Sequence, residues 1–468
     1  MVEVVGTAPT SVMVITKFVY RHSWKTNKFI IEAIFRISIS LKFKKMIKKK
    51  KLIISLVILI LLIFSIFLIF KIDNVANLPK KQKQILGNDI FKIFMKLPDP
   101  IKSSFMIISG KRSFSNLFND YNLKFLPETQ YISIDFSRKN IKFNKQNRYS
   151  FYLEVFKDKL IAVTKTGDFY QSDLSELIND ETDLNYKKLK IKNLFQKKGN
   201  IFDTLIVDNK IFVTKTSKYN DCERLEIYFA EIESVLNFSI FKSFDECISI
   251  GNGAGRIQRY VFKGDDGILL TTNDSDNDVP GSKAQNDNSI FGKIVFIYMN
   301  SKKYEIISKG HRNAQGLFVK DDIILSTEHG PKGGDEINKI FYKKNYGWPI
   351  ASYGEPYKSK KLKYKKSHAK NNFEEPMYTF LPSIGISELI LLPNTFNKKW
   401  TNSALVTSLN GRSIYRVNFQ DDKYEKILYL EKIYIGERIR DIKYVESLNI
   451  IVIALERTGN IGVLKNIN

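Results

Sequence analysis

The densest group of residues capable of chemistry runs from 310 to 353. Arg312 offers five guanidinium donors to a carboxylate, and Asn313 adds an amide that both donates and accepts hydrogen bonds. Gly330-Pro331 predicts a tight turn with outward carbonyls, the kind of oxygen that a hard cation such as Ca²⁺ accepts. The alternative is a glycine-rich surface loop around a buried Trp348, but so many unusual residue types rarely cluster for packing alone.

The elements that must position these residues form a repeat from about Tyr149 onward. Each copy has an apolar strand, a short polar turn, a second apolar strand and a third, with turn pairs such as Asp208-Asn209 between them. Six copies with a period of about 50 residues predict an all-β fold, a six-bladed β-propeller with ligands on the loop face around its axis. We expect residues 75–148 to hold a linker and part of the blade that closes the ring. The copies cover Phe151–Leu174, Phe202–Ile232, Arg256–Met299, Ala314–Ile340, Ile386–Phe419 and Ile439–Lys465.

The N-terminal part predicts a membrane anchor. Residues 52–70 are apolar except for Ser55 and Ser65, long enough to cross a bilayer, and seven lysines lie between Lys42 and Lys51. We therefore expect a cytoplasmic, lysine-rich segment 1–51, a single transmembrane signal anchor 52–70, a linker 71–100 and an exported propeller domain 101–468. This predicts a plasma (inner) membrane protein whose C-terminal domain lies in the periplasm or outside. A cleaved signal peptide is the alternative, and Met46 suggests that residues 1–45 are a gene-model extension.

Charge and cysteine content narrow the function classes. The formal net charge is +25, but the 74 Lys and Arg are spread along the whole chain without a basic stripe, which argues against nucleic-acid binding. Cys222 and Cys247 lie in neighbouring segments on the predicted exported side, where an oxidising compartment permits a disulfide. Two unpaired thiols in separate strands are the alternative.

The central run resembles the signature of the glucose/sorbosone dehydrogenase family, soluble quinoproteins that oxidise aldose sugars with pyrroloquinoline quinone (PQQ). The matching segments are Gly310 to Leu317 (GHRNAQGL), Glu328 to Asn338 (EHGPKGGDEIN) and Asn345 to Pro349 (NYGWP). The resemblance implies the same propeller fold, PQQ lying flat over the central opening, and Ca²⁺ between the quinone and two consecutive carbonyls.

The resemblance also implies the site residues. Arg312 and Asn313 match cofactor contacts, Gly330 and Pro331 match the Ca²⁺ carbonyl pair, and Gly436 to Asp441 (GERIRD) matches the segment whose arginines, here Arg438 and Arg440, contact the cofactor. Because PQQ carries three carboxylates, three arginines from two distant blades would satisfy it with charge-assisted bonds.

Two positions depart from the family pattern. The family's catalytic His, which takes the proton from the sugar hydroxyl, is replaced by Asn252, and an amide cannot act as a general base. A cofactor-contacting Lys is replaced by Asn410, which removes one positive charge. Of the four histidines, only His311 and His329 belong to the central motif, and the resemblance gives neither of them this role.

We therefore expect PQQ-dependent oxidation of an aldose sugar at the exported face of the membrane, with electrons passing to a respiratory acceptor. One alternative is a catalytically degenerate propeller that acts as a ligand-binding or assembly module. Another is an enzyme that hydrolyses a lactone with Ca²⁺ at the same site of the propeller. Fold alone does not choose between these functions.

Overall fold

The structure is a computed structural model that describes residues 129, 132–143, 149–220, 222–248, 255–274, 283–356 and 363–467. The predicted anchor 52–70 and Asn252 lie outside these residues. Within the described part of the chain, no helix is long and apolar enough to cross a membrane.

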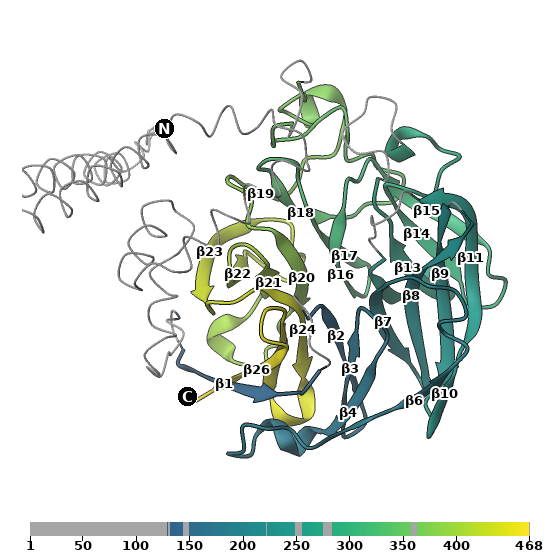
Figure 1. The fold of residues 1–468 in the computed structure, drawn as a ribbon. Coiled ribbons are helices and arrows are strands. Elements are labelled where there is room, and N and C mark those ends of the chain that lie inside the picture. Colours follow the sequence, from purple (N-terminus) through teal and green to yellow (C-terminus); the bar gives the residue numbers. More distant parts are fainter. Residues whose placement is uncertain are drawn as a thin grey trace, which may run out of the picture. The chain divides into compact units, whose positions relative to one another are not determined.

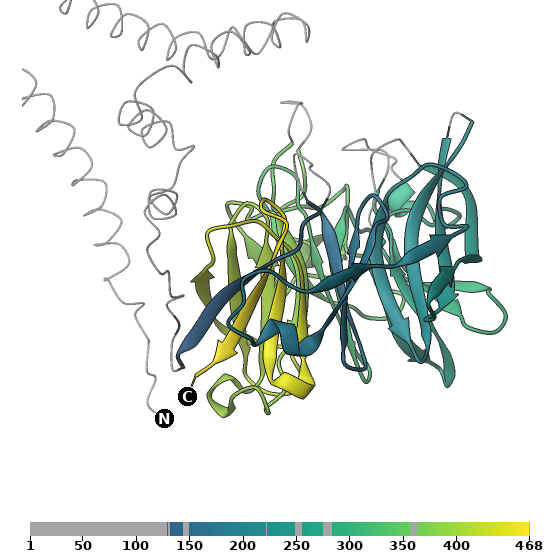
Figure 2. The same ribbon diagram turned by 60° about the horizontal axis from the view of Figure 1, so that its bottom comes forward.

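The described residues form the predicted six-bladed β-propeller, with six four-stranded antiparallel sheets arranged around an axis (Figures 1 and 2). The inner strands β2, β7, β12, β16, β20 and β24 begin the blades, and Figure 1 shows most of them gathered at the middle. Blade 1 contains β2 (Phe151–Phe156), β3 (Lys159–Thr164), β4 (Phe169–Asp173) and β5 (Tyr186–Lys188). Blade 2 contains β7 (Ile201–Val207), β8 (Lys210–Tyr219), β9 (Cys222–Glu231) and β11 (Ser239–Ile248). Blade 3 contains β12 (Ile257–Phe262), β13 (Asp265–Thr271), β14 (Lys293–Tyr298) and β15 (Tyr304–Lys309).

The remaining blades follow the same order along the chain. Blade 4 contains β16 (Ala314–Lys320), β17 (Ile323–Glu328), β18 (Asp335–Lys339) and β19 (Tyr378–Phe380). Blade 5 contains β20 (Ile386–Leu391), β21 (Ser403–Ser408), β22 (Ser413–Phe419) and β23 (Ile427–Tyr434). Blade 6 contains β24 (Ile439–Val445), β25 (Ile450–Leu455), β26 (Asn460–Asn466) and β1 (Ile134–Asn140). A parallel pair, β6 (Lys190–Lys192) and β10 (Val235–Asn237), and five 3-10 turns complete the elements: η1 (Leu174–Leu177), η2 (Lys283–Gln285), η3 (Ala369–Asn371), η4 (Lys398–Trp400) and η5 (Glu446–Leu448).

Blade 6 closes the ring with strands from both ends of the propeller. The first strand, β1, pairs antiparallel with the last, β26, from Ile134↔Asn466 to Asn140↔Asn460. This confirms that the segment before Tyr149 holds part of the closing blade.

Hydrophobic packing between blades holds the ring together. Six clusters of buried side chains fill the six spaces between neighbouring blades. The cluster between blades 5 and 6, for example, includes Leu405, Ile414, Ile442 and Ile453, all almost fully buried. Burying one such side chain stabilises the fold by about 1.5–3 kcal/mol. Each blade therefore depends on both neighbours, as expected for a closed propeller.

The predicted disulfide is present. Cys222 at the start of β9 and Cys247 near the end of β11 are bonded, with their Cα atoms 5.5 Å apart. These strands pair directly, so the bond fastens one end of blade 2.

Candidate functional site

The predicted site residues converge on one face because of the blade topology. In every blade the start of the inner strand pairs with the end of the second strand, as in Ala314↔Glu328 and Phe151↔Thr164. Connections that enter inner strands and leave second strands therefore share one end of the propeller, which we call the site face. Arg312, Asn313, Gly330, Pro331, Asn410, Arg438 and Arg440 all lie in or beside these connections.

Arg438 and Arg440 share one buried carboxylate, that of Glu456 at the end of β25. Arg438 Nε donates to Glu456 Oε2 at 2.6 Å, and Arg440 donates to Glu456 Oε1 through Nη2 at 2.7 Å and Nε at 3.2 Å. Ser150 Oγ also donates to this carboxylate. Burial acts to raise the pKa of Glu456, but Arg440, then the Ser150 hydrogen bond and Arg438, outweigh it and lower the pKa to about 2. The carboxylate is thus ionised at any working pH.

Gln315 joins this pair to the central motif. Arg440 Nη1 donates to Gln315 Oε1 at 3.2 Å, and Gln315 Nε2 donates to Asn313 Oδ1 at 2.8 Å. Three of the predicted cofactor contacts, from blades 4 and 6, are therefore linked in one hydrogen-bonded network: Asn313, Arg438 and Arg440.

Arg312 is held at the same face by backbone and aromatic contacts. Its Nη1 donates to the carbonyl of His329 at 3.1 Å, and its guanidinium carbon lies 5.2 Å from the centre of the Trp348 ring. The indole Nε1 of Trp348 in turn donates to the carboxylate of Asp274, which is buried. A cation over an indole ring gains electrostatic attraction, so this packing fixes the guanidinium.

The Gly330-Pro331 turn follows β17 and is shaped by Asp335. The Asp335 side chain accepts from the Gly330 amide at 3.1 Å with one oxygen and from the Ile384 and Ile386 amides at 3.0 Å with the other. Across the described ranges, no group of three or more His, Cys, Asp or Glu is arranged to hold a metal. The oxygen atoms that Gly330 and Pro331 themselves offer are backbone carbonyls, a type of ligand that hard cations accept.

Two buried glutamates lie beneath this turn. Glu328 and Glu336 are directly opposite each other on β17 and β18 and border a small cavity together with Gly330 and Pro331. Burial first, and then repulsion from Glu328, raises the pKa of Glu336 well above its ordinary value. A cation or a proton in this position would relieve the repulsion.

Asn410 follows β21 on the site face but does not join the network. Its backbone amide donates to the carbonyl of Ile384 at 2.9 Å, and its side chain is exposed. The structure describes no side-chain hydrogen bond for Asn410 among the residues it covers.

The histidines of the central motif have structural partners. His311 is fully buried, stacked on Tyr346, with its Nε2 2.8 Å from Ser308 Oγ and its Nδ1 3.0 Å from a Glu328 oxygen. The ring of His329 contacts the Ile386 carbonyl, and burial lowers its pKa. His311 is thus fixed between β15 of blade 3 and β17 of blade 4.

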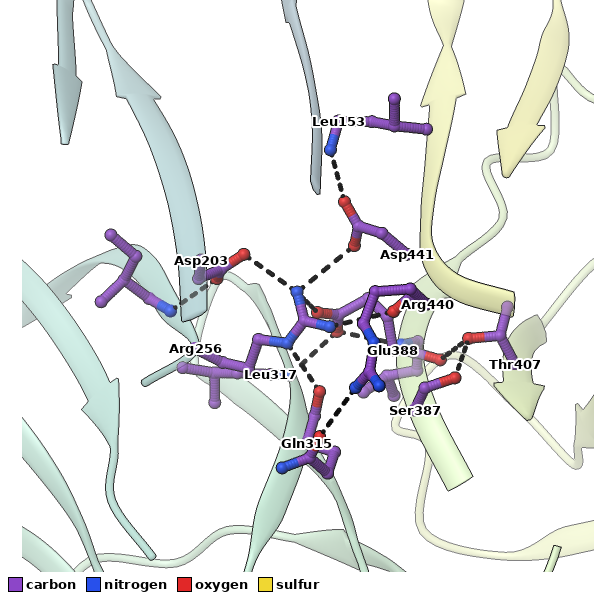
Figure 3. Close-up of polar contacts among 12 residues, drawn as sticks. Leu153, Asp203, Arg256, Gln315, Leu317, Ser387, Glu388, Thr407, Arg440 and Asp441 are labelled. Carbon is purple, nitrogen blue, oxygen red and sulfur yellow. Dashed lines mark hydrogen bonds and ion pairs between the residues drawn. The ribbon is translucent and has the colours of Figure 1, made fainter. Parts of the chain in front are cut away.

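A second charged centre, around Arg256, ties the inner strands together (Figure 3). Arg256 Nη1 lies 2.9 Å from Asp203, 3.1 Å from Glu388 and 3.4 Å from Asp441, and all four side chains are buried. Its Nε and Nη2 donate to the carbonyls of Gln315 and Arg440 at 2.7 and 3.1 Å. Four inner strands, β7, β16, β20 and β24, thus contact one guanidinium at the start of β12.

The acids of this centre also bind backbone amides of neighbouring blades. The second oxygen of Asp203 accepts from Ile257, that of Asp441 from Leu153, and that of Glu388 from Leu317. Burial raises the pKa of Glu388 to about 7, even though Arg256 acts to lower it.

Sequence reasoning missed Glu456 and the Arg256 centre. Gln315 lies inside the central motif and could have been singled out as a polar residue beside Asn313. Glu456 follows an apolar strand with no motif around it, and Asp203, Glu388 and Asp441 come from three different blades. Only the closed ring brings them together.

Comparisons with known proteins point to one family. Residues 238–463 match the family model described as Glucose / Sorbosone dehydrogenase. Aldose sugar dehydrogenase of Escherichia coli is 27% identical over 249 residues, which cover 49% of this chain and 65% of that protein. Quinoprotein glucose dehydrogenase B of Acinetobacter calcoaceticus is 29% identical over 134 residues, 27% of this chain and 26% of that protein. The chain thus covers less than two thirds of either relative.

A solved structure titled glucose dehydrogenase shares the fold, with a TM-score of 0.59 and 18% identity over 71% of this chain and 100% of that chain. Together with the family model over residues 238–463, these comparisons confirm the resemblance to the glucose/sorbosone dehydrogenase family that the motifs between Gly310 and Pro349 predict.

Proposed function

We propose that this protein oxidises an aldose sugar, with PQQ held over the axis on the site face and Ca²⁺ beside it. The observation that carries the proposal is the network linking Asn313, Arg438 and Arg440 across blades 4 and 6, next to Arg312. Further support comes from the sequence relatives, which are named as an aldose sugar dehydrogenase and a quinoprotein glucose dehydrogenase.

The donor set matches the chemistry of PQQ. Arg312, Arg438 and Arg440 would hold its carboxylates and quinone oxygens with charge-assisted hydrogen bonds. The carbonyls of Gly330 and Pro331 would hold Ca²⁺, with Asp335 keeping the turn in shape. Bound PQQ would supply the two-electron acceptor for the hydride that leaves the sugar. The residues of this chain bind and orient it, and electrons would pass on to a respiratory acceptor.

We also propose that residues 52–70 anchor the chain in the plasma membrane and that the propeller works on the exported side. Support comes from the apolar run flanked by lysines and from the Cys222–Cys247 disulfide, which suits an oxidising compartment.

A second candidate function is a propeller that binds a ligand or partner without turnover. Asn252 favours it, because the amide cannot take the proton of the sugar hydroxyl near neutral pH, and losing such a base costs about 10²–10⁴ in rate. Asn410 favours it too, since the site lacks the positive charge of a lysine there.

Dye reduction by the purified full chain separates the two candidates. We would supply PQQ and Ca²⁺, offer a panel of aldoses, and omit each component in turn. Sugar-dependent reduction that requires PQQ supports the dehydrogenase. The variant Asn252→His restores a base, and Asn252→Gln is its matched control that keeps an amide. Turnover only in Asn252→His would support the binding module, and no turnover in any variant would contradict the dehydrogenase.

A further inference from the structure

Among the residues that the structure describes, Glu456 is the acid in direct contact with two of the arginines proposed to hold the cofactor. Its side chain is 2% exposed, whereas the side chains of Arg438 and Arg440 are 26% and 15% exposed. The carboxylate therefore lies beneath the guanidinium groups, and the guanidinium groups lie closer to solvent.

Glu456 accepts hydrogen bonds from both arginines, in each case through the guanidinium Nε and, in Arg440, also through Nη2. Ser150, which lies directly before the inner strand of blade 1, holds the same carboxylate from another side. The guanidinium of Arg440, bound through two donors along one edge, keeps a fixed orientation, and the single bond from Arg438 Nε restrains the second guanidinium. The remaining donors of Arg440 therefore point in fixed directions.

Gln315 extends this arrangement to Asn313. Its backbone carbonyl accepts from Arg256 at 2.7 Å, its Oε1 accepts from Arg440, and its Nε2 donates to Asn313 Oδ1. Because Asn313 Oδ1 is thereby used as an acceptor, its amide nitrogen is the group left to donate to a ligand. The network thus sets which atoms face an incoming ligand.

We propose that Glu456 is a positioning residue for anion binding on the site face, holding Arg438 and Arg440 in their binding orientation before a polycarboxylate arrives. This inference rests on the proposed function in naming PQQ as that polycarboxylate. Fixing a rotamer-rich side chain during binding costs affinity, and a site that is already ordered avoids that loss.

The opposite role for Glu456 is electrostatic competition. A buried carboxylate between two arginines cancels one positive charge, and on that basis alone its removal would strengthen anion binding. Positioning predicts weaker binding instead. The sign of the change therefore separates the two roles.

Two substitutions at Glu456 use this difference. Glu456→Gln keeps the shape and removes the charge, and we expect PQQ to bind about tenfold or more weakly, despite the added net positive charge. Glu456→Asp keeps the charge but is too short to span both arginines, and we expect a loss in the same direction. Competition predicts tighter binding for the first variant and unchanged binding for the second.

Glu431→Gln is the matched control. Glu431 accepts from Arg416 Nε at 2.6 Å in a pair that is also buried, with side chains 6% and 0% exposed, but this pair lies between β22 and β23, away from the inner strands. We expect this variant to lower stability while PQQ affinity stays within twofold of the original chain. Equal affinity losses in both variants would mean that Glu456 acts only through stability.

The titration uses the full chain with Ca²⁺, PQQ and, separately, the planar probe benzene-1,3,5-tricarboxylate. Weaker binding of either probe by both Glu456 variants, with the control unchanged, supports positioning. Tighter or unchanged binding by Glu456→Gln overturns it. If the original chain binds the tricarboxylate but not PQQ, this contradicts the proposed function. The affinities of the Glu456 variants for the tricarboxylate then still test the positioning role of Glu456. If the original chain binds neither probe, both fail.

Discussion

Removing the Arg256 guanidinium should destabilise the propeller strongly near neutral pH and much less in acid. In Arg256→Met the apolar part of the side chain is largely kept, but Asp203, Glu388 and Asp441 lose the cation that lies 2.9–3.4 Å from their oxygens. Removing one partner of a buried ion pair typically costs about 3–5 kcal/mol.

The acids themselves limit the size of this loss, because each can take up a proton instead of remaining a buried anion. For an aspartate with an ordinary pKa near 3.9, protonation at pH 7 costs about 4 kcal/mol, and at pH 5 about 1.5 kcal/mol. Glu388, whose pKa is already about 7, adds little. The ceiling for one such aspartate is therefore about 4 kcal/mol at pH 7 and about 1.5 kcal/mol at pH 5. Asp203 falls below this ceiling, because burial already raises its pKa.

The sign of the pH dependence follows from linkage. Burial already holds the folded-state pKa values of Asp203 and Glu388 above their unfolded values, and without Arg256 these pKa values rise further. The stability that protonation provides is therefore present at low pH and is lost as pH rises. The assay is urea unfolding of the full chain at pH 5 and pH 7, compared with Arg259→Met. Arg259 is half exposed and pairs with Asp266, so its loss should cost less than about 1 kcal/mol at either pH.

A loss below about 1 kcal/mol at pH 7 for Arg256→Met would show that the centre does not hold buried, ionised acids. A loss that is equal at pH 5 and pH 7 would show the same.

Two more predictions concern stability. Because the pKa of Glu388 is raised, its protonation stabilises the fold below about pH 4.5, and this contribution is lost as pH rises to about 7. Between pH 5 and pH 8 the original chain should therefore lose up to about 3 kcal/mol of stability relative to Glu388→Gln, measured by urea unfolding. A stability difference that does not depend on pH would contradict the raised pKa. Replacing both Cys222 and Cys247 with Ser should lower stability by about 3.5 kcal/mol by the chain-entropy estimate, since the bond closes a loop with a sequence separation of 25. A reductant should lower the stability of the original chain toward that of the double variant, and a reductant effect on the double variant would contradict this explanation.

The repeating part of the fold was predictable because its signals are local. Apolar strands such as Ile450–Leu455 and turn pairs such as Asp208-Asn209 recur in each copy, so the number of blades follows from the sequence. The fourth strands of blades 1–5 were missed, because each predicted copy ended after a third strand, even where the fourth is as long as β11 or β23. β5 and β19 have three residues each, too few for an alternating pattern to stand out.

The candidate site was predictable only in part. Motifs locate Arg312, Asn313, Arg438 and Arg440, and the blade topology brings them to one face. Their fixed geometry depends on Glu456, which reaches the two arginines only because β25 pairs with β24. Asp203, Glu388 and Asp441 meet Arg256 across blades, and no local pattern in the sequence encodes such a contact.

Equilibrium titration of the full chain with PQQ in the presence of Ca²⁺ would show whether the arginines of the site face hold PQQ. We expect saturable binding that is lost in the double variant Arg438→Ala/Arg440→Ala. Binding should be kept in Arg259→Ala, because Arg259 lies further along the inner strand of blade 3. Binding that is absent from the original chain, or equal in all three proteins, would contradict this role of the arginines.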